Sequence, residues 1–237
     1  MDRVLISGDL HGSYLNLQYI IDQFHTDSSD IVVLLGDVGI NFDKSRKEYK
    51  TKQRLAKKPL TMFCIHGNHE ARPYTVEGYE EAEWHGGTVY VDPRFPNQIF
   101  AKDGEIYDLL GKKCIVIGGV YSVDKPYRLA NGWMWFPDEQ PDDEIKSHVE
   151  ENLEKADWKV DVVFSHTCPY NRMPTHLFDS EVDQSTVDYS TEEWLQTIED
   201  RLEFDEWYFG HYHANEKNGK FTMLFHDVVE LQPKEAE

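Results

Sequence analysis

The feature that most constrains this chain is a series of short apolar runs followed by polar blocks rich in Asp, Asn and His. Continuous rather than alternating apolar runs are typical of strands that are buried on both faces of a sheet. Ligands of open α/β sheets gather at the carboxyl ends of the strands, so we expect these polar side chains to lie close together. Four of the five blocks follow such a run, and the blocks are Asp9-Leu10-His11-Gly12, Gly36-Asp37, Gly67-Asn68-His69-Glu70, Ser165-His166 and Gly210-His211-Tyr212-His213.

The runs and the segments between them predict the order of the elements. The first part is expected to be strand, helix, strand, helix, strand, with Ser13 as the candidate N-cap of the first helix. The middle holds short strand candidates separated by Gly and Pro, which are typical of antiparallel hairpins, and then an irregular stretch over residues 118–141. The expected strands cover residues 4–6, 31–35, 60–65, 88–91, 98–101, 105–109, 113–117, 160–164 and 207–209, with a final hairpin or strand pair over 221–231, and the expected helices cover 13–24, 44–58, 142–157 and 191–202.

This alternation predicts an α/β fold in which two packed sheets carry helices on their outer faces. The chain has 237 residues, without a linker rich in Pro, Gly or Ser, a low-complexity tract or an internal repeat. One domain over residues 1–232 is therefore expected. Residues 233–237 are expected to form a flexible C-terminal tail.

The charge balance restricts the class of partner. The formal net charge is -20, with 44 acidic against 24 basic residues. A general nucleic-acid binder carries a basic face, so this composition disfavours that role. A phosphorylated small molecule remains compatible with it, because bound divalent ions reverse the local potential.

Cysteine usage and hydropathy predict the compartment. The three cysteines are widely spaced and form no Cys-x-x-Cys pair, which is typical of a reducing compartment. The first residues lack the layout of a signal peptide, and no apolar run approaches the length of a membrane span. We therefore expect a cytoplasmic protein that does not enter the membrane. The sequence favours no particular oligomeric state.

The residue types in the blocks predict metal binding. Asp9 and His11 lie two apart just beyond a strand, as do His211 and His213, so that a turn can aim both members of each pair at one ion. Asp37 ends the neighbouring strand, and its two oxygens can bridge two ions. Mixed carboxylate and imidazole ligands suit Mn, Fe or Zn, of which we favour Mn. Two transition-metal ions side by side indicate hydrolysis of a phosphoester.

The series of blocks resembles the calcineurin-like metallophosphoesterase superfamily. The resemblance spans residues 9–213. It implies a metallophosphoesterase-type β-sandwich of two mixed sheets flanked by helices, in four α/β/β/α layers. It also implies a metal-dependent phosphoric ester hydrolase, a phosphatase or phosphodiesterase with a binuclear metal centre. The implied ligands are Asp9, His11 and His213 on the first ion, Asn68, His166 and His211 on the second, and Asp37 between the two.

The resemblance further implies a mechanism. A hydroxide that bridges the two ions attacks the phosphorus of a phosphomonoester or phosphodiester in line. His69 binds no metal in such enzymes and is the expected general acid for the leaving oxygen. Glu70, Asn41 and Asp43 are the alternatives for the group that orients His69.

The second block departs from one branch of the superfamily. Protein serine/threonine phosphatases carry Gly-Asp-x-x-Asp-Arg-Gly, where this chain has Ile40 and Asn41 in place of the second Asp and the Arg. That Arg grips the phosphate, so its loss favours a small-molecule or nucleotide substrate over a protein. Lys125, Arg128 and Arg72 are the candidates for replacing it.

Two alternative functions remain from the sequence. One is an enzyme similar to the protein serine/threonine phosphatases, and the other is a catalytically silent scaffold that still binds metal. The chain retains every expected ligand together with His69. This completeness favours an active enzyme.

Overall fold

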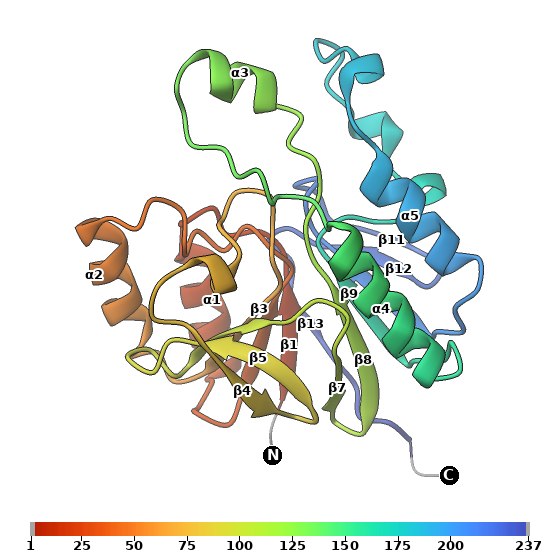
Figure 1. The fold of residues 1–237 in the computed structure, drawn as a ribbon. Coiled ribbons are helices and arrows are strands. Elements are labelled where there is room, and N and C mark those ends of the chain that lie inside the picture. The colour runs from red at the N-terminus through yellow and green to blue at the C-terminus, as the bar shows by residue number, and fades with distance from the viewer. Residues whose placement is uncertain (1–2, 236–237) are drawn as a thin grey trace.

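The computed structural model describes residues 3–235, in which two β-sheets pack against each other (Figure 1). The first sheet has seven strands in the order β13-β1-β2-β3-β6-β5-β4, and the second has six in the order β11-β12-β10-β9-β8-β7. The first sheet comprises β1 (Val4–Ser7), β2 (Ile31–Leu34), β3 (Thr61–Cys64), β4 (Glu80–Trp84), β5 (Gly87–Val91), β6 (Gln98–Ala101) and β13 (Val229–Glu230). The second comprises β7 (Ile106–Leu109), β8 (Lys112–Ile117), β9 (Val162–Ser165), β10 (Glu206–Phe209), β11 (Glu216–Asn218) and β12 (Phe221–Met223).

Both sheets are mixed. Strands β1, β2, β3 and β6 are parallel neighbours, and antiparallel strands flank them on both sides. In the second sheet β8, β9, β10 and β12 are parallel, with β7 and β11 antiparallel at the edges. The parallel strands of both sheets are covered on both faces, which explains their continuous apolar sequences.

Alternate residues of one strand face different layers. In β1, Val4 and Ile6 join an apolar cluster that also holds Val162 and Phe164 of the second sheet, so this cluster fills the space between the sheets. Leu5 points the other way and packs in a separate cluster with the helices on the outer face. The period of two along a strand thus builds two cores from one run of apolar residues.

Helices cover the outer face of each sheet (Figure 1). Helices α1 (Leu15–Phe24) and α2 (Arg46–Leu55) pack on the first sheet, and α4 (Asp143–Lys155) and α5 (Ser190–Glu199) pack on the second. Ser45 caps α2 and Asp142 caps α4, each by accepting a hydrogen bond from a backbone N–H in the first turn. The predicted four layers and the predicted α/β class are confirmed.

The short helices lie in the connections. Helix α3 (Lys125–Ala130) projects beyond the sheets in Figure 1, and no residue of it is buried. Single 3-10 turns cover Pro73–Thr75, Tyr170–Arg172, Thr175–Leu177 and Gln184–Thr186. No helix within residues 3–235 has the length and apolar character needed to span a membrane.

Three expectations about the elements were wrong. The N-cap of α1 is Tyr14, without a side-chain hydrogen bond, and Ser13 lies outside the helix. Residues 118–141 contain α3 instead of being irregular throughout. Strands β12 and β13 form no pair, because the chain crosses from the second sheet to the first between them.

The domain boundary at residue 232 stays a prediction. Within the expected tail, the backbone N–H of Lys234 donates to the carbonyl of Leu110, and its ammonium group donates to Asp161 at 2.8 Å. Residues 236–237 of the tail lie outside the described residues.

Candidate metal centre

The polar blocks meet where parallel strands of both sheets end. Three blocks follow β1, β2 and β3 of the first sheet, and two follow β9 and β10 of the second. The carboxyl ends of neighbouring parallel strands lie at one edge of a sheet, and ligands bind in the crevice beyond them. Packing the two sheets together brings their five blocks into one cluster.

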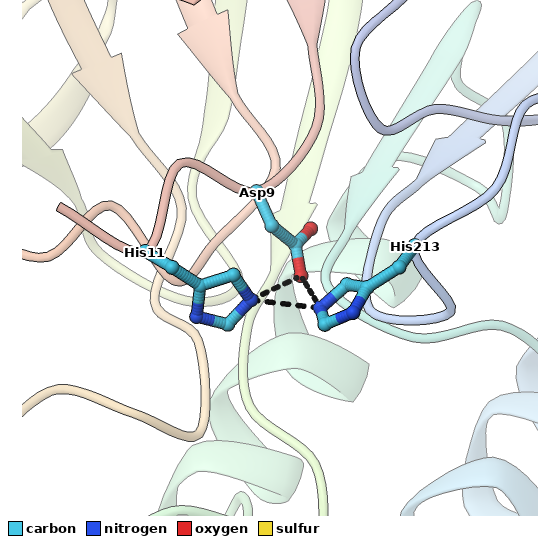
Figure 2. A group of neighbouring side chains, drawn as sticks. All are labelled: Asp9, His11 and His213. Atoms are coloured by element: carbon cyan, nitrogen blue, oxygen red, sulfur yellow. Dashed lines mark hydrogen bonds and ion pairs between the residues drawn. The ribbon is translucent and has the colours of Figure 1, made fainter. Parts of the chain in front are cut away.

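Asp9, His11 and His213 form the first group of converging side chains (Figure 2). Oδ2 of Asp9 lies 3.4 Å from Nε2 of His213 and 3.6 Å from Nε2 of His11. The two Nε2 atoms are 2.7 Å apart. Three donor atoms therefore face one point, in an arrangement that could hold a metal ion.

Asp9, Asp37 and His166 form a second group of the same kind. Oδ2 of Asp37 lies 3.8 Å from Nε2 of His166 and also 3.8 Å from Nε2 of His11. Nε2 of His166 is in turn 2.9 Å from Oδ1 of Asn68. Asp37 thus belongs to the second group and also approaches His11 of the first, so one carboxylate can serve both.

His211 lies beside these groups. Its ring centroid is 5.2 Å from that of His166, and its backbone N–H donates to Oδ1 of Asp9 at 3.0 Å. Burial holds the pKa of His211 well below its usual value, so the ring is neutral and able to donate a lone pair. Neither group of donors found among residues 3–235 includes it.

The environment of Asp9 fits a bound cation. The residue is 1% exposed, and its Oδ2 has no hydrogen-bond partner among the described residues. A buried carboxylate oxygen without a partner is costly. Burial alone acts to raise the pKa of Asp9, yet His11 and His213 hold that pKa well below the usual range. The site therefore favours positive charge beside this oxygen, and its oxygen and imidazole donors suit a transition metal.

Backbone conformation at the centre is unusual. His11, Asp37, His211 and His213 have φ angles of 46°, 47°, 68° and 51°, in the left-handed region that non-glycine residues avoid. Each such residue costs on the order of 1–3 kcal/mol, and such strain gathers at functional sites. The strain turns each side chain towards the cluster directly after its strand.

The glycines of two blocks leave room for the ligands. A Cβ atom at Gly36 would lie 2.1 Å from Nδ1 of His166, and one at Gly210 would lie 2.3 Å from Oδ1 of Asp9. Side chains at these positions would displace the two ligand candidates. The Gly-Asp and Gly-His pairs in the sequence therefore have a steric cause.

Partners behind the ligands fix their orientation. Nδ1 of His166 lies 2.6 Å from the carbonyl oxygen of Leu35, a contact that assigns the N–H to Nδ1 and leaves Nε2 free to bind. Nδ2 of Asn68 donates to Oγ of Ser122 at 2.8 Å, and that hydroxyl donates to Glu139. This chain turns the carbonyl oxygen of Asn68 towards His166.

Ser122→Ala is expected to weaken metal binding by about 10–100-fold, because loss of a partner behind a ligand has effects of this size. The Asn68 amide would lose the acceptor that sets its orientation. Titration of the metal against a chromogenic chelator measures the affinity. The exposed Ser147→Ala should retain the affinity of the parent protein. Equal affinities for both variants would contradict the proposed orientation of Asn68.

His69 lies against the cluster from a separate direction. Its Nε2 is 4.0 Å from Oδ2 of Asp37, and its backbone N–H donates to Oδ1 of the same residue at 2.8 Å. Burial lowers the pKa of His69; the Asp37 carboxylate opposes this effect and the Arg128 guanidinium adds to it. Burial thus disfavours the protonated form of the ring, and negative charge nearby favours it.

The three candidates for orienting His69 have other partners. Glu70 accepts hydrogen bonds from the backbone N–H groups of Val38 and Gly67, and so ties the second block to the third. Asn41 accepts from Lys52, and Asp43 accepts from the backbone of Ser45. The groups that contact Nε2 of the His69 ring are the side-chain amide nitrogen of Asn68, at 3.2 Å, and Arg128, at 3.4 Å.

The three candidate cations lie in different places. Arg128 contacts His69 and is held by Asp124 through a hydrogen bond of 2.7 Å. Lys125 lies over the rings of Tyr121 and Trp135. Arg72 is buried and pairs with Asp103, and it lines a different cavity from the one at the metal centre. Among the three, the contacts of the described residues join only Arg128 to the centre.

A cavity of about 310 Å³ opens onto the cluster. Its wall includes Asp37, Asn68, His69, His211 and His213.

The sequence did not predict the contributions of Ser122 and Glu139 behind the ligands and of Glu192 in the cavity wall. Nothing in the local sequence signals them, because each acts through a neighbour that is distant in the chain.

Comparisons with known proteins place this chain in a family. The crystal structure of TT1561 of thermus thermophilus is 12% identical, with a TM-score of 0.53, over 96% of this chain and 97% of that one. Another crystal structure is 14% identical, with a TM-score of 0.46, over 98% of this chain and 99% of that one. At such identities the likeness to TT1561 shows the fold alone. No curated protein matches the sequence. The sequence model described as calcineurin-like phosphoesterase matches residues 2–215, and the chain therefore belongs to the calcineurin-like phosphoesterase family.

Proposed function

We propose that the protein is a two-metal phosphoesterase that hydrolyses phosphomonoesters or phosphodiesters of small molecules or nucleotides. The observation that carries the proposal is the approach of Asp37 to both groups of converging donors, since it belongs to one group and lies 3.8 Å from His11 of the other. A buried Asp9 oxygen without a hydrogen-bond partner among the described residues belongs to the same cluster. Two adjacent donor groups of mixed carboxylate and imidazole type suit a pair of transition-metal ions.

The residues fit the ligand roles as follows. Asp9, His11 and His213 would hold one ion, Asn68, His166 and His211 would hold the other, and Asp37 would contact both. When bound, such ions supply Lewis-acid activation of water and of the phosphoryl oxygens. Mn is the favoured metal, with Fe and Zn as alternatives.

The chain's own groups complete the chemistry. Nε2 of His69 faces the cluster at 4.0 Å from Asp37 and is the group that would deliver a proton to the leaving oxygen. Arg128 lies 3.4 Å from the same nitrogen but outside the cavity lining, and its guanidinium would have to turn towards the phosphate to pair with it. Asp124 holds Arg128 in this position. The cavity of about 310 Å³ at the centre provides room for the rest of the substrate.

The positions that differ from the protein serine/threonine phosphatases support a small substrate. Ile40 and Asn41 are fully buried, and Asn41 is bound to Lys52. Neither residue lines the cavity at the centre. The site thus takes no phosphate-gripping group from this block, which disfavours a phosphoprotein as substrate.

The cysteines support a cytoplasmic location. Cys64, Cys114 and Cys168 are all free and buried. Burial raises the pKa of each thiol, so none is readily oxidised. A chain with free thiols and no disulfide among its described residues suits a reducing compartment.

Metal analysis combined with hydrolysis of p-nitrophenyl phosphate and bis(p-nitrophenyl) phosphate tests the proposal. We expect about two metal ions per chain and turnover of at least one ester by Mn-loaded protein. Removal of the metal with a chelator should abolish turnover, and Mn should restore it. Two bound ions without turnover of either ester would instead establish the metal-binding scaffold.

A further inference from the structure

The cavity at the metal centre extends away from the ligands. The rest of its lining, which we call the far end, comes from Tyr121, Val123 and Asp124 after β8, from residues between 177 and 192 that lead into α5, and from Tyr212. In Figure 1, α3 and the segment preceding α5 project on the same side of the two sheets. A substrate whose phosphate lies at the ligands would place its leaving group in this far end.

Aromatic side chains form part of the far end. Tyr121, Phe178, Tyr189 and Tyr212 all line it. The rings of Phe178 and Tyr212 are nearly parallel, with an interplanar angle of 14° and centroids 6.2 Å apart. Flat aromatic surfaces favour stacking of another planar ring. The shape and composition therefore suit an aromatic leaving group.

The charges of the far end have one sign. Four carboxylates line it, at Asp124, Asp179, Asp188 and Glu192, and no Lys or Arg of the described residues lines the cavity. Asp124 is paired with Arg128, so its charge is partly neutralised. Asp179 and Asp188 repel any further negative group on the substrate, and Glu192 adds to this repulsion when it is ionised.

Glu192 has an unused hydrogen-bond acceptor. Its side chain is 3% exposed, and its Oε1 accepts a hydrogen bond from Thr167 at 3.0 Å. Its Oε2 is buried without a partner among the described residues. Burial raises the pKa of this carboxyl to about 7. A buried polar atom without a partner needs an explanation, and an N–H donor on the ligand would be the missing partner of Oε2.

We infer that the far end binds an aromatic ring that carries N–H donors and no further negative charge, with the ring against Phe178 and Tyr212 and an N–H directed to Oε2 of Glu192. This inference rests on the proposed phosphoesterase function and names its substrate class. Phosphate esters of nucleoside-like or aminoaryl alcohols have this chemistry. Polyphosphates, nucleic-acid strands and acidic phosphopeptides lack it.

Two esters of matched size test the inference, one with an amine and one with a carboxylate at the para position of the ring. The kcat/KM for para-(aminomethyl)phenyl phosphate is expected to exceed that for para-(carboxymethyl)phenyl phosphate by about tenfold or more, because like charges repel and the amine can donate to Glu192. In the Glu192→Gln variant, the ratio of the kcat/KM for the amine ester to that for the carboxylate ester should fall to about threefold or less. The matched control Glu193→Gln, at an exposed position, should keep the ratio of the parent protein. p-Nitrophenyl phosphate reports the hydrolytic activity itself.

A second variant tests the aromatic wall. Phe178→Leu is expected to lower the preference for phenyl phosphate over glycerol 2-phosphate by about threefold to tenfold, since one stacking surface is lost. If the parent protein hydrolysed none of the esters, including p-nitrophenyl phosphate, the proposed function would be overturned and this inference with it. Turnover of p-nitrophenyl phosphate with an amine-to-carboxylate ratio near one, or an unchanged ratio in Glu192→Gln, would overturn the inference alone.

Discussion

Asp37→Asn is expected to lower kcat/KM for p-nitrophenyl phosphate by about 10³-fold or more, because the lost metal activation is worth several kcal/mol. Oδ2 of Asp37 stands 3.8 Å from two imidazole nitrogens in different donor groups. The amide would remove the negative charge that both proposed ions share. It would retain the acceptor for the backbone N–H of His69, so the loop should keep its conformation.

The metal content of Asp37→Asn should fall together with its activity. Elemental analysis of the purified variant measures the first quantity, and ester hydrolysis measures the second. Asp22→Asn is a matched control, because Asp22 is exposed on α1 and accepts a hydrogen bond only from the neighbouring Gln18 among the described contacts. A variant at position 37 that kept both ions and full activity would refute the assigned role of Asp37.

The strands that carry the site could be predicted because of how deeply they are buried. Every residue of β1, β2 and β9 is buried, so the sequence of each is apolar and continuous or nearly so. Strand β4 could not be found in this way. Its sequence is Glu-Glu-Ala-Glu-Trp, its residues are exposed or half-buried, and it lies at the edge of the first sheet. Hydrophobic patterning detects buried strands, and the residues of β4 are too little buried to produce such a pattern.

The sequence does not predict helix α3 or the separate sheets of the last two strands, for related reasons. No residue of α3 is buried, so its six residues carry no apolar period. Strands β12 and β13 have three and two residues, and both follow turns, which makes a hairpin the simplest interpretation. Only the tertiary structure shows that the chain changes sheet between them.

The residues brought together at the centre could be proposed from the sequence because they end strands. The groups behind them could not. Asn68 is 54 residues away from Ser122, and His69 is 59 residues away from Arg128. Such pairs depend on how the loop after β8 returns to the centre, and no local pattern encodes that path. For the same reason no local pattern encodes the pairing of Arg72, two residues after the third block, with Asp103, and its role in substrate binding stays a prediction.

His69→Asn is expected to lower kcat by about 10²–10⁴-fold for an alkyl phosphate such as glycerol 2-phosphate, the range for loss of general acid catalysis. An alkoxide is a poor leaving group and needs a proton as the bond to phosphorus breaks. Nitrophenoxide leaves without one, so p-nitrophenyl phosphate should lose much less activity in the same variant. The ratio of the two losses therefore isolates proton donation from binding.

Metal content separates the role of His69 from that of the ligands. The backbone N–H of residue 69, which donates to Asp37, remains in the variant, so the ions should stay bound. His25→Asn is the matched control, since His25 is exposed at the end of α1, in a left-handed conformation that Asn tolerates. Equal losses for both esters with bound metal intact would assign His69 to phosphate binding. Loss of the bound metal would indicate that His69 is a metal ligand. The general acid role requires a larger loss for the alkyl ester at unchanged metal content, because only that role depends on the basicity of the leaving oxygen.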